Sequence, residues 1–178
     1  MAEFDNIPAA DAPIFLVGFM GAGKTTVGRA LARQLEWDFF DLDDLIEQRA
    51  GKSVQAIFAG SGESEFRRVE REALKSCSEL VRSVIALGGG AYVSEENRNS
   101  LRGIGKTVWL DCPVEVCLRR ISGDRSRPLL SGEDEMRALL ELRGSAYAQA
   151  DFVVQSGNHT PEVLAIEIAK LLGKSATS

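Results

Sequence analysis

The chain has 178 residues, of which 44% are hydrophobic and 26% charged, and this composition suits one soluble domain with a sizeable core. A count of 21 Lys and Arg against 26 Asp and Glu gives a net charge of -5, which argues against a broad surface for nucleic acid or for a membrane. Three cysteines without a CxxC pair and one histidine favour neither a disulfide framework nor a zinc site, so we expect a reducing, cytoplasmic setting.

The two ends of the chain differ in character from the part between them. Residues 1–12 are acidic and lack both a basic segment and a long apolar run, so we expect a short disordered leader, not a signal peptide or a membrane span. One domain is expected over 13–173, followed by a disordered tail over 174–178. Nothing in the sequence demands more than a monomer.

From residue 13 onward, short apolar runs alternate with longer amphipathic ones, which is typical of a parallel α/β sheet. Helices are predicted over 25–35 and 161–172, each with one apolar face. The fold class expected is therefore α/β, with helices on both faces of a five-stranded parallel sheet. The predicted strands are 13–19, 37–43, 83–88, 106–112 and 152–156.

The strongest chemical signal is the stretch GFMGAGKT at 18–25, which satisfies G-x-x-x-x-G-K-[ST] between a predicted strand and a predicted helix. Its glycines permit backbone angles that direct N–H groups at phosphate oxygens, and the helix N-terminus adds positive charge. Lys24 would bridge the β- and γ-phosphates, and the Thr25 hydroxyl would coordinate Mg²⁺. This P-loop predicts a nucleoside triphosphate site. The absence of an N-K-x-D motif argues against a GTPase switch, and a core strand that ends in three glycines argues against an ATPase motor.

Three carboxylates follow in FFDLDD at 39–44. Asp41 and Asp43 stand two apart at the end of a predicted strand, so their side chains should point to the same side. Two like charges about 4 Å apart repel by roughly 4 kcal/mol at an effective dielectric near 20, so aspartates would face the phosphates unfavourably. We therefore expect a divalent cation and a neutral hydroxyl to lie between them. Asp44 begins DLIE, which resembles a helix-capping box and predicts a structural role.

Two further features predict contacts with a small molecule. Gly88, Gly89 and Gly90 end a predicted strand at the edge of the sheet where ligands bind, and they would let a ligand lie against the backbone. Arg67 and Glu70 stand three apart on a predicted helix over 62–77, so the carboxylate can hold the guanidinium ready to bind a substrate carboxylate. Arg68 and Arg71 are assigned to a solvated face.

The ordered set of motifs from about residue 14 to residue 172 resembles shikimate kinase. The set is the P-loop, D-x-D at 41–43, E-F-R-x-x-E at 65–70, the three glycines, R-P-L at 127–129 and Arg143. The resemblance implies a fold of the nucleoside monophosphate kinase type with a lid over about 122–134. It also implies transfer of the γ-phosphoryl group of ATP to the 3-hydroxyl of shikimate, a step toward chorismate and the aromatic amino acids.

The resemblance also implies roles for individual residues. Asp43 would bind the acceptor hydroxyl, as a base or as an orienting group, and Asp41 would approach Mg²⁺ through water. Arg67 and Arg143 would hold the shikimate carboxylate, while Gly88, Gly89 and Gly90 would contact its hydroxyls through the backbone. The implied catalytic residues are Lys24, Asp43 and the lid residue Arg127. The implied ATP-binding residues are Gly21, Ala22, Gly23, Lys24, Thr25, Thr26, Arg120 and Arg127, with Arg120 and the turn over 158–161 framing the adenine.

Two other functions stay open on the sequence. One is a related P-loop kinase for another hydroxy acid, such as gluconate, which would need the same residue types. The E-F-R-x-x-E motif combined with three glycines favours shikimate. The other is a catalytically silent nucleotide-binding module that works through a partner. The presence of Lys24, Thr25, Asp43 and Arg127 argues against it, because a silent protein has no chemical need for all four.

Overall fold

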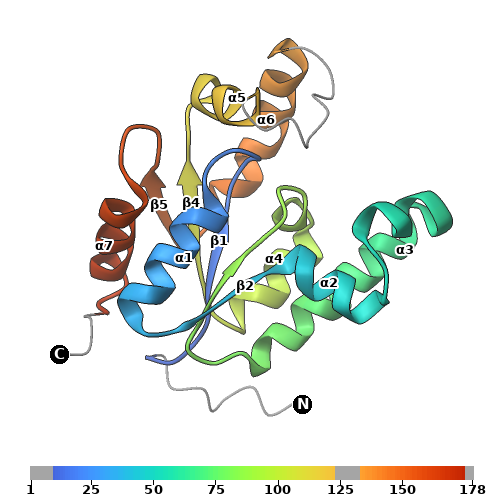
Figure 1. Cartoon of the computed structure of the whole chain (residues 1–178), viewed down its shortest axis with the longest axis horizontal. Helices are drawn as coiled ribbons and strands as arrows, with labels where there is room; N and C mark the ends of the chain where they lie inside the picture. The colour runs from blue at the N-terminus through green and yellow to red at the C-terminus, as the bar shows by residue number, and fades with distance from the viewer. Residues whose placement is uncertain (1–9, 123–132, 175–178) are drawn as a thin grey trace.

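The computed structural model describes residues 10–122 and 133–174. Within these residues, five parallel strands form one sheet in the order β2-β3-β1-β4-β5 (Figure 1). The α/β class and the five parallel strands predicted above are confirmed. The elements are β1 (Ile14–Val17), α1 (Lys24–Leu35), β2 (Asp38–Asp41), α2 (Leu42–Ala50), α3 (Val54–Ser76), the 3-10 turn η1 (Cys77–Glu79), β3 (Ser83–Ala86), the 3-10 turn η2 (Ala91–Val93), α4 (Glu95–Arg102), β4 (Lys106–Asp111), α5 (Val114–Ser122), α6 (Glu133–Tyr147), β5 (Phe152–Gln155) and α7 (Pro161–Leu171).

The direction in which the chain crosses the sheet places helices on both faces. It moves from β1 outward to β2, and then moves in the opposite direction through β3, β4 and β5. Connections between parallel strands of one sheet are right-handed, so a change in the direction of travel also changes the face on which the connecting helix lies. As a result, α1 lies on one face, and α3, α4 and α6 lie on the other. Helix α7 packs beside α1. All residues of β1 and β3 are buried, as two covered faces require.

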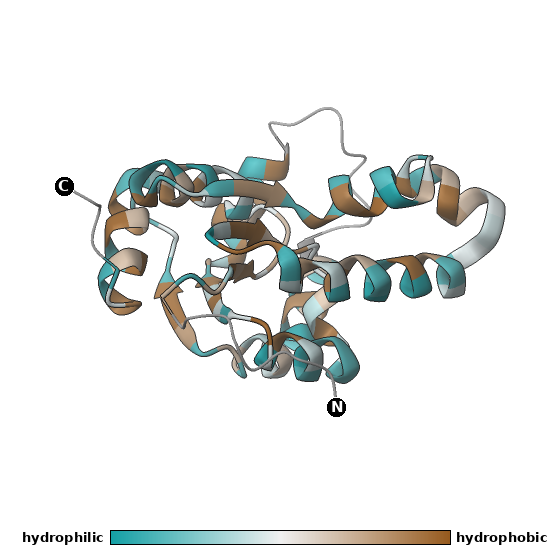
Figure 2. Ribbon diagram, turned by 90° about the horizontal axis from the view of Figure 1, so that it is seen from below, coloured by the Kyte–Doolittle hydropathy of each residue, from teal (hydrophilic) through white to brown (hydrophobic). Residues whose placement is uncertain are grey.

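The helices bury the faces that the apolar spacing predicts. In α1 the buried residues include Val27, Ala30, Leu31 and Leu35. Figure 2 shows hydrophilic and hydrophobic residues alternating along the helices, as expected where one side of a helix packs on a core and the other faces solvent. Helix α3 begins at Val54, eight residues before the predicted helix over 62–77, and its helical geometry is interrupted at Gly62, where φ is 77°.

The strands end sooner than predicted, and the residues beyond them have specific reasons to leave the sheet. The predicted strand 13–19 ends at Val17, because Gly18 has a φ of 143° that starts the loop to α1. The predicted strand 37–43 ends at Asp41, because α2 begins at the next residue. Each early end places the following residues at the carboxyl edge of the sheet, where the candidate site lies.

The inner ends of the predicted leader and tail belong to the described residues and contact the domain. Residues 10–12 carry contacts, since the Asp11 carbonyl accepts the Arg82 N–H at 2.8 Å. Lys174, assigned to the tail, lies 4.2 Å from the ring centre of Trp37 and donates to the Ala10 carbonyl. The predicted lid over 122–134 lies largely outside the described residues, and its two ends belong to α5 and α6. In the described part of the chain, every helix is too short or too polar to cross a membrane.

Gly105→Ala is expected to lower the free energy of unfolding by about 1–3 kcal/mol. A Cβ atom at this position would lie 2.1 Å from the Pro13 carbonyl oxygen, which also accepts the Lys106 N–H at 3.0 Å. The start of β4 would have to move away from Pro13. Urea denaturation followed by circular dichroism measures the loss. In the control Gly103→Ala the nearest atom is the Ser100 carbonyl oxygen at 3.9 Å, so stability should hold. Equal losses in both variants would contradict the packing argument.

Candidate functional site

The chain leaves β1, β2 and β3 at the same edge of the sheet, and the three departing segments line one cavity of about 260 Å³. These segments are the P-loop after β1, the aspartates after β2 and the glycine turn after β3. Helix α5 contributes Arg120 from the side of the P-loop. Of the predicted site residues, the cavity lining includes Gly21, Gly23, Lys24, Thr25, Thr26, Asp41, Asp43, Gly88, Gly89 and Arg120.

The P-loop adopts a conformation that depends on glycine. Gly21 and Gly23 have φ values of 76° and 95°, in the left-handed region that other residues rarely adopt. A Cβ atom on Gly21 would also lie 2.7 Å from the Cys117 carbonyl oxygen of α5. Lys24 begins α1, and its Nζ donates to the carbonyls of Gly18 and Phe19 at 2.9 and 2.8 Å. The lysine therefore lies across the loop, at the helix N-terminus where phosphate binds.

Asp41 and Asp43 line the same cavity, as predicted. The predicted reason, that both lie on one side of a single strand, does not apply, because Asp43 belongs to α2. Asp41 is the last residue of β2 and caps α2, since its Oδ1 accepts the Asp43 N–H at 3.1 Å. Its Oδ2 accepts the Thr25 hydroxyl at 3.2 Å. Asp43 and Asp44 both lie in the first turn of α2. The predicted capping role of Asp44 is therefore wrong, because Asp41 already occupies the cap.

The glycine turn 88–90 brings together the three side chains that the sequence assigns to the acceptor. A Cβ atom on Gly88 would lie 3.2 Å from Asp43 Oδ1. One on Gly89 would lie 3.3 Å from Arg143 Nη1, and one on Gly90 would lie 3.2 Å from Arg67 Nη2. Each glycine thus leaves room for one polar side chain. The side chain beside Gly88 comes from α2, the one beside Gly89 from α6 and the one beside Gly90 from α3.

The backbone of this turn is also arranged for a ligand. Its three carbonyls are engaged, by the N–H of Ala91, the hydroxyl of Tyr147 and the N–H of Val93. No residue in 10–122 or 133–174 accepts a hydrogen bond from the N–H groups of the three glycines. A hydroxyl or carboxylate group lying on the turn would supply acceptors for these N–H groups.

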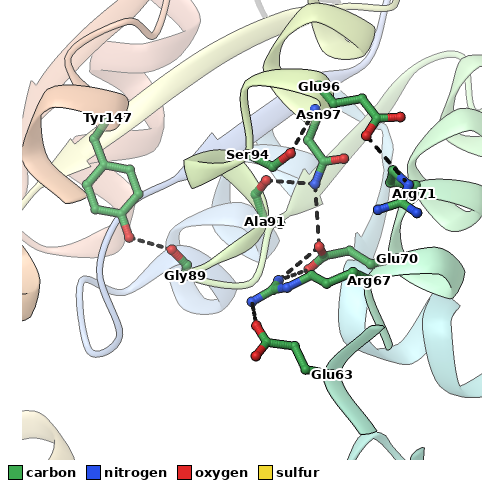
Figure 3. A network of polar contacts seen from close by, with 10 residues as sticks. All are labelled: Glu63, Arg67, Glu70, Arg71, Gly89, Ala91, Ser94, Glu96, Asn97 and Tyr147. Carbon is green, nitrogen blue, oxygen red and sulfur yellow. Dashed lines mark hydrogen bonds and ion pairs between the residues drawn. The ribbon is translucent and has the colours of Figure 1, made fainter. Parts of the chain in front are cut away.

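Arg67 is held in place by the buried carboxylate of Glu70 (Figure 3). Its Nη1 donates to Glu70 Oε1 at 3.1 Å and to Oε2 at 3.0 Å, and its Nη2 donates to Glu63 at 3.4 Å. Glu70 is only 2% exposed. Asn97 donates through Nδ2 to Glu70 Oε2 at 3.4 Å and to the Ala91 carbonyl at 2.9 Å, and so ties this pair to the glycine turn.

The neighbouring arginines of α3 behave differently. Arg68 is half exposed and pairs with Glu65 and Glu72. The hydrogen bond from Arg68 lowers the pKa of the Glu65 carboxyl. Arg71 lies 3.7 Å from Glu96 in an exposed pair. Both match the solvated face predicted for them.

Helix α6 supplies Arg143 and, one turn later, Tyr147. Tyr147 is fully buried, and its hydroxyl donates to the Gly89 carbonyl at 2.6 Å. Burial raises the pKa of this hydroxyl above its usual value, so it keeps its proton at neutral pH and remains a donor. Neither Tyr147 nor Asn97 was predicted, because their partners lie 58 and 27 residues away in the sequence and no local pattern marks either residue.

The remaining predicted contacts are those of Arg120, the turn over 158–161, Ala22 and Arg127. Arg120 donates through Nη1 to the Gly21 carbonyl at 3.1 Å, so it contacts the P-loop, and its contact with adenine stays a prediction. In the predicted adenine turn over 158–161, the Thr160 hydroxyl caps α7 by accepting the Val163 N–H at 3.4 Å. Ala22 is buried behind the loop. Arg127 lies outside the described residues.

Comparisons with known proteins agree on one family. A family model described as shikimate kinase matches residues 20–173. A shikimate kinase of Geobacter sulfurreducens is 42% identical over 167 residues, which is 92% of this chain and 92% of the relative. The solved shikimate kinase of Acinetobacter baumannii in complex with shikimate has a TM-score of 0.84 at 38% identity, and the match covers 93% of this chain and 97% of that one. A solved gluconokinase of Sinorhizobium meliloti has a TM-score of 0.62 at 18% identity over 92% of this chain and 93% of its own, which shows a shared fold alone.

Glu70→Gln is expected to lower the free energy of unfolding by about 1–3 kcal/mol, because a buried acceptor of two charged hydrogen bonds loses its charge. Thermal and urea unfolding measure the change. Glu72→Gln is the matched control on the same helix, where the side chain is 41% exposed and pairs with Arg68. Its stability should change by no more than about 0.5 kcal/mol, because exposed ion pairs contribute little. A larger loss in the control than in Glu70→Gln would contradict the role given to Glu70.

Proposed function

The chain belongs to the shikimate kinase family, and we propose that its site transfers the γ-phosphoryl group of ATP to the 3-hydroxyl of shikimate, which yields shikimate 3-phosphate and ADP. The observation that carries this proposal is the glycine turn, where Asp43, Arg143 and Arg67 lie 3.2, 3.3 and 3.2 Å from the places that Cβ atoms at its three positions would occupy. Shikimate has one carboxylate and several hydroxyls on a ring. Two arginines, one aspartate and three open backbone N–H groups match those groups in kind.

The donor and acceptor sides of the cavity divide the work. Phosphoryl transfer depends on positioning and on stabilising the charge of the moving group. On the donor side, the P-loop N–H groups and Lys24 would bind the phosphates, with Lys24 exchanging its loop carbonyls for phosphate oxygens. On the acceptor side, the Asp43 carboxylate would accept a hydrogen bond from the attacking hydroxyl and hold it in line, or remove its proton. Arg127 is proposed to add a second cation at the transferred group.

Arg67 and Arg143 would bind the acid end of the acceptor. A carboxylate between two guanidinium groups gains charge-assisted hydrogen bonds, and Glu70 keeps Arg67 in one orientation before the substrate arrives. The Arg67 guanidinium donates to Glu70 through Nη1, and its Nη2 lies beside Gly90. This face of the guanidinium is the one that would meet the substrate.

The residues around Thr25 suit Mg²⁺. The Thr25 hydroxyl and an Asp41 carboxylate oxygen lie 3.2 Å apart beside the P-loop, and both are the hard oxygen donors that this ion prefers. We propose that Thr25 coordinates Mg²⁺ directly and that Asp41 does so through water. The ion would supply positive charge to the phosphates, and it would separate them from the two aspartates.

Two proposals concern the surroundings of the enzyme. The glycine turn, α2, α3 and α6 of one chain supply the acceptor-side groups, which supports activity as a monomer. Cys77, Cys112 and Cys117 are buried free thiols, which supports the predicted reducing, cytoplasmic setting.

The purified chain with Mg²⁺ and ATP is expected to release ADP when shikimate is added, and not when gluconate is added. A coupled ADP-release assay measures the rate, and ³¹P nuclear magnetic resonance identifies the phosphorylated product. Preference for gluconate would replace the proposed substrate with another hydroxy acid. No release above background hydrolysis with either acid would instead favour a silent nucleotide-binding module.

Asp43→Asn is expected to lower kcat by about 100-fold or more while leaving ATP affinity nearly unchanged, because it removes the charge on the acceptor side alone. Steady-state kinetics and titration with a fluorescent ATP analogue separate the two effects. Asp44→Asn is the matched control, since Asp44 is exposed and lies outside the cavity lining. Its kcat should stay within about twofold of the parent. Unchanged turnover in Asp43→Asn would contradict the role assigned to Asp43.

A further inference from the structure

The hydroxyl of Tyr147 is one of the few buried polar groups near the site that has no assigned part in the reaction. Its ring is fully buried, lies 6.0 Å from the ring of Trp109, and so has a position fixed by packing. Its hydroxyl donates a hydrogen bond from α6 to the Gly89 carbonyl at 2.6 Å (Figure 3). Because the pKa of this hydroxyl is raised by burial, the hydroxyl is a permanent donor at neutral pH.

The bond sets the direction of a peptide group that faces the acceptor. In a planar trans peptide, the carbonyl and the following N–H point in opposite directions. When Tyr147 holds the Gly89 carbonyl on the side of α6, the N–H of Gly90 must point to the other side of the turn. Glycine peptides rotate freely for lack of a side chain, so a turn of three glycines has no steric means of choosing this orientation.

The same helix turn also fixes the distance between the glycine turn and Arg143. A Cβ atom on Gly89 would lie 3.3 Å from Arg143 Nη1 and 3.7 Å from the Tyr147 hydroxyl, so the two side chains flank one residue. On the far side of the turn, Asn97 holds the Ala91 carbonyl and Glu70 together. Buried side chains thus hold the middle residue of the turn, Gly89, and the residue that follows the turn, Ala91.

We propose that Tyr147 is a positioning residue for the acceptor: its hydroxyl orients the Gly89–Gly90 peptide and keeps it in register with Arg143, so that acceptor affinity depends on a group that the acceptor does not touch. This inference rests on the proposed function, because it takes the glycine turn and Arg143 as the surface to which shikimate binds. The donor side is not involved, since within the described residues the hydrogen bond of this hydroxyl goes to the glycine turn and not to the P-loop.

The test is Tyr147→Phe in the full chain, which keeps the ring and removes the hydroxyl alone. We expect KM for shikimate to rise about five- to tenfold, the equivalent of one lost hydrogen bond. KM for ATP and kcat should both stay within about twofold, because the loss affects the bound and transition states of the acceptor equally. Calorimetric titration of shikimate into the variant should show the same loss of affinity.

Tyr92→Phe is the matched control. Tyr92 is 3% exposed, and its hydroxyl lies 3.4 Å from the Thr107 hydroxyl, on the core side of the same loop. Its loss should lower the melting temperature as much as the loss at Tyr147, with no change in KM for shikimate. A purely structural role for Tyr147 predicts that the two variants behave alike in both measurements.

The outcomes are separable. If the parent chain phosphorylates shikimate and Tyr147→Phe keeps the parent KM, the inference is overturned and the proposed function stands. A variant that does not fold while Tyr92→Phe does would also overturn it, because the hydroxyl would then serve stability alone. A parent chain without activity on shikimate would overturn the proposed function and this inference with it. A selective rise in KM for shikimate supports both.

Discussion

The parallel pairing of β1 with β3 is the constraint from which the site follows. Leu16 stands in register with Ala86, and the Leu87 N–H donates to the Leu16 carbonyl at 3.0 Å, just before each strand gives way to its loop. Neighbouring strands lie about 4.8 Å apart. The P-loop and the glycine turn therefore start side by side, which brings a phosphate donor and its acceptor within reach of each other. An antiparallel pair would have put the two loops at opposite edges of the sheet.

The strands supply backbone, and the surrounding helices supply charge. Asp43 comes from α2, Arg67 from α3 and Arg143 from α6, and each reaches the turn from a different direction. A chain with a net charge of -5 can still bind anionic substrates, because Lys24, Arg120, Arg67 and Arg143 lie around the carboxyl edge of the sheet. The buried Glu70 is part of this arrangement: it fixes the direction of Arg67 at the cost of a carboxylate removed from water.

The sequence predicts the parts of this site that are local. The P-loop pattern predicts a helix that follows the glycine loop, and α1 begins at Lys24. The three-residue spacing of Arg67 and Glu70 predicts the pair found at 3.0 Å. Boundaries fail where two kinds of structure compete for the same residues. Asp41 could extend a strand or cap a helix; it does both, and so Asp43 falls in α2. Contacts such as Tyr147 to Gly89 join segments 58 residues apart, and no periodicity in either segment records them.

The close approach at the glycine turn also limits how the acceptor specificity of such an enzyme can evolve. At three successive positions a Cβ atom would lie 3.2 to 3.3 Å from a functional group, so alanine at any of them would require the neighbouring aspartate or arginine side chain to shift by a few tenths of an ångström. Substitutions on the turn therefore also displace the aspartate and the arginines that face the acceptor. The long side chains of α3 and α6 can instead be shortened or reversed in charge without moving the sheet, so we expect changes of acceptor to arise there.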